Sequence, residues 1–74
     1  MKRLELQLIR RIDALPKDKA FWPTREQDRR ACEALLEAGY LKSLVIPIGS
    51  GSQRGYRADK RKAIYREAKS LGLF

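Results

Sequence analysis

The chain has 74 residues, with 17 Lys and Arg against 9 Asp and Glu and no His, so its formal net charge is +8. This length predicts one small domain, near the lower limit at which a single apolar core is stable. No apolar run approaches the ~18 residues of a membrane helix, and the N-terminus lacks a signal-peptide core. We therefore expect a cytoplasmic protein with no membrane partner.

The composition also excludes most catalytic and metal chemistry. One Cys and no His rule out an internal disulfide, a zinc site and catalysis that depends on His. Cys32 falls within a predicted helix, where a buried, inert thiol is the expected state. The Gly and Ser run at 49–52 lacks the Gly-Lys-Ser/Thr of a phosphate-binding loop. We expect a binding protein rather than an enzyme, with no cofactor and no metal.

The first predicted element is an amphipathic helix over residues 2–15. Apolar residues recur along it at helical spacing, at Leu4, Leu8, Ile12 and Leu15. Pro16 ends the helix, because the residue before a proline is driven out of the α region. Leu6 lies off the apolar stripe, so it packs on a neighbouring segment or, in a homodimer, on the partner chain.

A short connection over 16–23 leads to a second predicted helix over 24–38. In the connection, Phe21 and Trp22 are interpreted as core anchors, with base stacking as the alternative. Thr24 opens a capping box, and Gly39 is the expected left-handed stop. The predicted core face consists of Ala31, Ala34, Leu35 and Ala38, with Cys32 and Leu36 at its edge.

Beyond Gly39 the periodicity changes from helical to alternating, which predicts a β-hairpin over 41–58. Leu44, Ile46 and Ile48 are expected on one face of the first strand, with Val45 and Pro47 on the other. Pro47 indicates an edge strand.

A third helix is predicted over 59–71, with Asp59 as its N-cap. Its expected buried stripe is Ile64, Ala68 and Leu71. The overall order of helix, helix, hairpin and helix makes an α+β domain over 1–74.

The positive charge is concentrated in the second half of the chain. Residues 38–74 carry eight basic side chains against only Asp59 and Glu67. A basic half of a short domain is the electrostatic footprint of a polyanion binder, usually of nucleic acid, although a solubilising surface has the same composition.

Two segments resemble parts of a winged-helix DNA-binding domain. The run Leu35-Leu36-Glu37-Ala38-Gly39-Tyr40-Leu41 is similar to the helix end and corner before the wing in small bacterial and phage regulators. Gly55-Tyr56-Arg57-Ala58-Asp59-Lys60-Arg61-Lys62 is similar to the second wing strand and the start of a terminal helix. The resemblance spans residues 31–71. It implies a winged helix-turn-helix in which the second helix is truncated, because only residues 16–23 are available for it.

The resemblance implies that the protein binds double-stranded DNA as a transcription regulator of bacterial, phage or mobile-element origin, with a homodimer as one option. The implied recognition-helix contacts are Thr24, Arg25, Gln27, Arg29 and Arg30. The implied wing and backbone contacts are Lys42, Ser50, Ser52, Gln53, Arg54, Arg57, Lys62, Arg66 and Lys69.

An alternative function stays open at this point. Glu26, Glu33 and Glu37 lie on the helix face that would meet DNA, where phosphates repel carboxylates. The same fold then serves as a protein-interaction module that binds an acidic partner.

Overall fold

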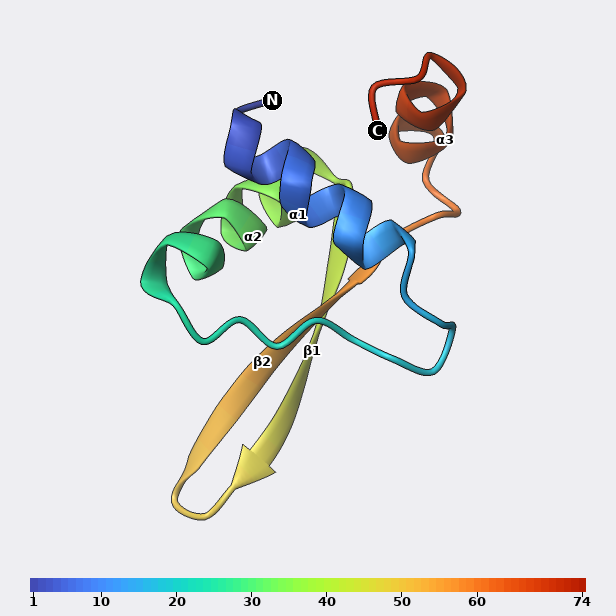
Figure 1. Ribbon diagram of the computed structural model, residues 1–74. Helices are drawn as coiled ribbons and strands as arrows, with labels where there is room; N and C mark the ends of the chain where they lie inside the picture. The colour runs from blue at the N-terminus through green and yellow to red at the C-terminus, as the bar shows by residue number, and fades with distance from the viewer.

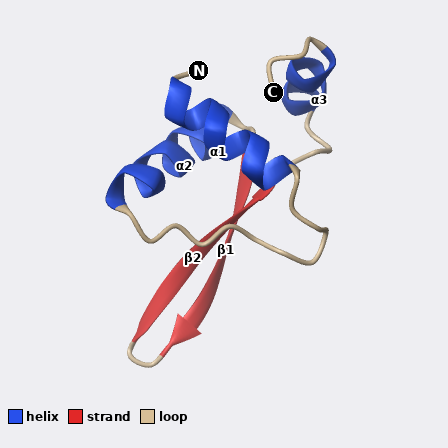
Figure 2. Cartoon of the chain, viewed as in Figure 1, coloured by secondary structure: helices blue, strands red, loops and turns tan.

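The computed structural model describes all residues, 1–74. Its elements in chain order are α1 Arg3–Asp13, α2 Glu26–Ala38, β1 Leu41–Ile48, β2 Gly51–Ala58 and α3 Ala63–Ser70 (Figure 1). The predicted α+β class and the order of helix, helix, hairpin and helix are therefore confirmed. The helices gather at one end, and the hairpin projects from them as an arm (Figure 2). This arm gives the molecule its length, 43 Å against 23 and 19 Å in the other directions.

Each helix is shorter than predicted, and two predicted N-caps are wrong. Arg25, not Thr24, precedes the first turn of α2, and no side chain caps that turn. Lys62, not Asp59, precedes α3. The backbone N–H of Asp59 donates to the Tyr40 carbonyl at 3.0 Å, which holds the chain against the corner before β1, and the residues after it form a turn rather than the first turn of the helix. By contrast, Gly39 ends α2 as predicted, with φ of 93° in the left-handed region.

The core lies between α1, α2 and the base of the hairpin. Its nine buried residues are Leu8, Ile9, Ile12, Ala31, Cys32, Leu35, Leu41, Tyr56 and Tyr65. Burial of these side chains is the main stabilising contribution available to a chain of this length.

Two predicted helix faces are rotated relative to the observed ones. On α2, Ala34 and Ala38 are exposed, and Cys32 is fully buried rather than at the edge. On α3, Tyr65 faces the core beside Ala68, whereas Ile64 and Leu71 are 43% and 70% exposed. A large aromatic side chain buries more apolar area than either aliphatic one, and so Tyr65 decides which face of this short helix is buried.

The connection between α1 and α2 crosses the hairpin in an extended conformation. Phe21 pairs with Tyr56 through two backbone hydrogen bonds of 2.8 and 2.9 Å, on the edge of β2 that faces away from β1. Phe21 packs at the margin of the core, as predicted. Trp22 does not join the core, because it lies over Gly55, on the opposite face of the hairpin from Tyr56.

The close approach of Trp22 to Gly55 leads to a prediction about stability. A Cβ at position 55 would lie 2.7 Å from the indole ring, so Gly55→Ala is expected to destabilise the fold by about 1–3 kcal/mol. Gly51→Ala is the matched control on the same strand, where the nearest atom is the Ile48 carbonyl oxygen at 3.9 Å. Urea unfolding of both variants tests this, and equal midpoints would contradict it.

Candidate functional site

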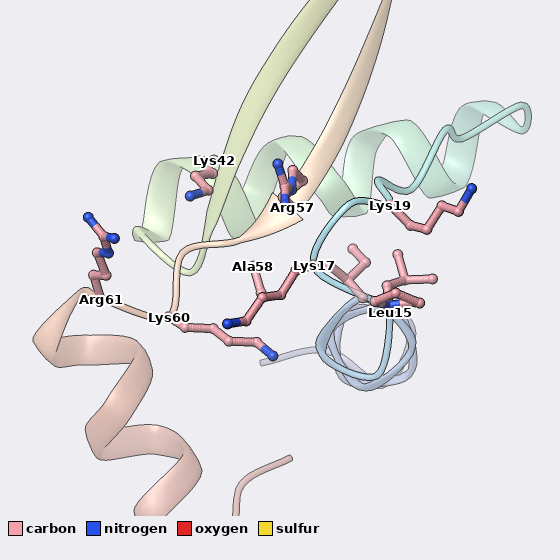
Figure 3. A pocket seen from close by; sticks show the side chains of 10 residues that line it. Leu15, Lys17, Lys19, Lys42, Arg57, Ala58, Lys60 and Arg61 are labelled. Atoms are coloured by element: carbon pink, nitrogen blue, oxygen red, sulfur yellow. The ribbon is translucent and has the colours of Figure 1, made fainter.

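A cleft at the base of the hairpin has a volume of about 370 Å³. Three segments form it: the end of α1 with the loop that follows, the strand ends at the hairpin base, and the link between β2 and α3 (Figure 3). Six of the ten lining side chains are cationic, and none is acidic. These six, called the cationic cleft residues below, are Lys17, Lys19, Lys42, Arg57, Lys60 and Arg61.

Two of the cationic cleft residues are held together by the register of the hairpin. Lys42 and Arg57 are direct partners across β1 and β2, so both side chains stand on the same face. Like charges placed directly opposite each other destabilise a strand pair. A bound anion would remove this repulsion, and the pair is therefore better suited to a ligand than to the stability of the fold.

The cationic cleft residues are almost free of acidic partners. Lys60 is the exception: its ammonium donates to the backbone carbonyl of Asp13 at 3.2 Å and lies 3.8 Å from the carboxylate. The other five form no ion pair within the chain. Most of the positive charge of the cleft is therefore available to an external anion.

Asp13, at the end of α1, lies beside the cleft residue Lys60 and fixes α3 to α1. Its carboxylate accepts hydrogen bonds from the Tyr65 hydroxyl and from the Lys69 ammonium, the latter at 2.9 Å. Burial acts to raise the pKa of Asp13, but the hydrogen bonds from Tyr65 and Lys69 and the charges of Lys69 and Lys60 lower it overall. Burial and the contact with Asp13 raise the pKa of Tyr65. This cluster positions the link that carries Lys60 and Arg61.

Several charges on the exposed face of α2 are held in ion pairs. Arg30 pairs with Glu26 at 3.1 Å. Glu33 accepts a hydrogen bond from the Tyr56 hydroxyl at 2.6 Å and pairs with Arg54 at 3.0 Å. The hydrogen bond from Tyr56 is the main cause that lowers the pKa of Glu33. Burial opposes it, and the hydrogen bond and charge of Arg54 add to the lowering. Burial and the neighbouring Glu33 raise the pKa of Tyr56 to about 12.

These pairs bear on the residues predicted from the sequence. Arg30, Arg54 and Lys69 were all predicted to contact DNA, and each is engaged by a carboxylate. Arg54 lies in the middle of β2, not at the tip of the hairpin. Of the predicted wing residues, Lys42 and Arg57 alone line the cationic cleft.

The remaining predicted residues lie on separate surfaces. Arg25 and Gln27 line a hollow between α1 and the start of α2, and Arg29 faces Ser52 and Gln53 of β2. Thr24, Ser50, Lys62 and Arg66 are exposed.

Four of the cationic cleft residues were not selected from the sequence: Lys17, Lys19, Lys60 and Arg61. Both pairs belong to short basic runs, Lys17-Asp18-Lys19 and Lys60-Arg61-Lys62. The two runs are visible in the sequence. That they line the same cleft depends on the path of residues 14–25 across the hairpin, which no local pattern predicts.

Other chemistry has little support in the structure. Cys32 is buried, and burial together with Asp28 and Glu33 raises the pKa of its thiol to about 12, which leaves it unreactive. No group of three His, Cys, Asp or Glu side chains comes together to bind a metal. None of the three helices has the length and apolarity needed to span a bilayer.

Comparisons of the chain with known protein families, with curated protein sequences and with solved structures find no significant match. The function is therefore inferred from the geometry and charge of the site.

Proposed function

We propose that this protein binds double-stranded DNA, with a stretch of the phosphate backbone lying in the cationic cleft. The observation that carries this proposal is the gathering of six cationic side chains, five of them without an acidic partner, around one concave surface. Lys and Arg contacts to phosphates supply most of the affinity of a DNA-binding protein and release condensed counterions. Arg57 and Arg61 add planar guanidinium groups, which hold phosphate oxygens in a bidentate way.

The arrangement of elements supports a winged-helix-like role as a regulator of transcription. A helix, an extended segment paired with β2, a second helix and a hairpin follow in that order. In such an arrangement the start of α2 reads bases, and Arg25, Gln27 and Arg29 are exposed there. Neither of the two arginines is held in an ion pair, in contrast to Arg30. We assign contacts with DNA bases to these three residues and contacts with the DNA phosphate backbone to the cationic cleft residues.

A titration of labelled random-sequence duplex DNA at increasing salt tests the proposal. Each phosphate contact contributes about 0.9 to the slope of log affinity against log salt, so five free cations predict a slope of roughly −4 to −5. Polyglutamate of the same total charge is the control for an acidic protein partner. We expect duplex DNA to bind at least ~10-fold more tightly, because guanidinium groups match phosphate geometry. Failure to bind duplex at ~50 mM salt, or tighter binding of polyglutamate, would contradict the proposal.

A further inference from the structure

Trp22 lies in surroundings that the core does not explain. An added Cβ at Gly55 would come within 2.9 Å of three atoms of its six-membered ring. The side chain is only partly buried, and it belongs neither to the core nor to the apolar side chains packed against the core. Its indole N–H is not buried and donates to no group of the chain. Trp22 therefore presents part of its ring and a free donor to solvent.

The backbone on both sides of Trp22 is fixed. Phe21 pairs with Tyr56 of β2 through two backbone hydrogen bonds, and Pro23 is buried. The connection between α1 and α2 therefore crosses the hairpin on a defined path and carries the indole ring with it (Figure 1). An aromatic ring that is held in place before a ligand arrives loses little conformational entropy when the ligand binds.

The hairpin face under Trp22 is the face that begins in the cationic cleft. Side chains alternate between the two faces of a strand, so Gly55 lies on the same face as Arg57 and its partner Lys42. The two rows are one repeat apart, ~7 Å along the strands. Lys19, three residues before Trp22, lines the same cleft. Cations and a partly exposed aromatic ring are therefore neighbours on one surface.

Farther out on this face, the chemistry changes from charged to apolar. Residues 43–53 contain no charged side chain. Ile46 and Ile48 are 40% and 52% exposed. Gln53, the partner of Ile46, adds an amide that both donates and accepts hydrogen bonds. A phosphate would meet no cation on this part of the face, whereas a base would meet apolar surface and an amide.

We propose that this face binds unpaired DNA bases, so that the preferred DNA is a duplex that continues into a single strand. The phosphate backbone lies in the cationic cleft, and the first unpaired base stacks on Trp22. Stacking on an aromatic side chain beside a positively charged groove is a general way to hold single strands. Inside a duplex the flat faces of the bases are covered by their neighbours, so only an unpaired base offers a face to Trp22. The preference rests on the proposed function, since the cleft must hold the backbone for a base to reach Trp22.

Fluorescence anisotropy with three labelled DNAs tests this preference: a blunt duplex of ~12 base pairs, the same duplex with a single-stranded extension of ~6 nucleotides, and that extended duplex with abasic sites throughout the extension. The two extended DNAs carry the same number of phosphates, so a difference in affinity between them reports contacts with bases. We expect the extension with bases to bind at least ~5-fold more tightly than the abasic one, with the extension placed on one strand or the other.

The fluorescence of Trp22 gives a second readout, because it is the only Trp of the chain. We expect the extension with bases to quench this fluorescence, because the base lies directly on the indole ring. The abasic extension is expected to leave it unchanged. This measurement needs no variant, so it remains valid if a substitution at position 22 prevents folding.

Variants of Trp22 separate stacking from the packing over Gly55. Trp22→Leu keeps an apolar cover but has no aromatic ring, and it is expected to bind the two extended DNAs with equal affinity. Trp22→Phe is the matched control: it keeps a ring on which a base can stack, and it is expected to retain a preference for the extension with bases. Circular dichroism melting establishes that each variant is folded.

Two results would overturn the preference for unpaired bases. One is equal affinity of the wild-type chain for the two extended DNAs, without quenching of Trp22. The other is a preference for bases that Trp22→Leu retains in full. Either result, together with binding of the blunt duplex, leaves the proposed function intact. Quenching by the extended DNA without binding of the blunt duplex would instead support stacking and contradict the proposed function.

Discussion

Simultaneous replacement of Lys42 and Arg57 with alanine is expected to lower the affinity for duplex DNA roughly 50-fold at ~0.1 M salt. The two side chains face each other across the hairpin and line the same cleft. A cation that binds a phosphate accounts for about one unit of the salt slope, so the double variant should show a slope shallower by close to two units. Fluorescence anisotropy with the labelled duplex measures both quantities.

The matched control for this prediction is the double variant Lys2→Ala and Arg3→Ala. It removes the same net charge from two exposed positions at the start of α1. The cleft lies at the other end of this helix, where Ile12 lines it. A general effect of net charge would weaken both double variants equally, and this result would contradict a site in the cleft. We expect the control to bind less than ~5-fold more weakly than wild type, because charges outside the interface act only through the screened field.

Asp13→Ala is expected to destabilise the fold by about 2–3 kcal/mol, mainly because the Tyr65 hydroxyl is left without a partner. Tyr65 is 1% exposed, and its hydroxyl has no other acceptor. The ammonium of Lys69 contributes less, because its side chain is about half exposed. A small domain has a total stability of about 5 kcal/mol, so this decrease is large. Urea unfolding at pH 7 measures it.

The pH dependence distinguishes the charge of Asp13 from its packing. A carboxylate whose pKa is lowered by folding adds stability above the unfolded value of ~3.9, and that stability is lost as the pH falls through the folded value. The difference in stability between wild type and Asp13→Asn should therefore shrink below pH ~4. Glu33, whose pKa is also lowered, retains part of the acid sensitivity in the variant. A difference that is constant with pH would show that the carboxylate contributes no charge-dependent stability.

Much of the fold was accessible from local patterns in the sequence. The spacing of Leu8 and Ile12, the glycine after α2 and the alternation through β1 each reflect chemistry within one element. Errors arose where another element competes. Thr24 and Asp59 have the side chains of N-caps, but the helices begin one and three residues further on, after Arg25 and Lys62, and Asp59 is tied through its backbone to Tyr40. On α3, Tyr65 and its acceptor Asp13 determine which face is buried, and the two residues are far apart in the sequence.

The candidate site was less accessible than the fold. Lys42 and Arg57 were predicted as phosphate contacts from the resemblance, and they meet in the structure because they are partners within one hairpin. Lys17 and Lys19 reach the same cleft only because the chain crosses β2 at Phe21. Likewise, the ion pair between Arg54 and Glu33 joins β2 to α2, and no pattern within either element predicts it.

The most direct test of the central claim is a map of backbone amide chemical shifts in the ¹⁵N-labelled protein during titration with a duplex of about 12 base pairs. We predict that the largest shifts fall on residues 15–19, on Lys42 and on residues 57–61, the segments that form the cleft. A smaller set is expected at the start of α2. Large shifts confined to α2 or to residues 43–53 of the hairpin, with the cleft unchanged, would contradict the proposal that the phosphate backbone lies in the cationic cleft.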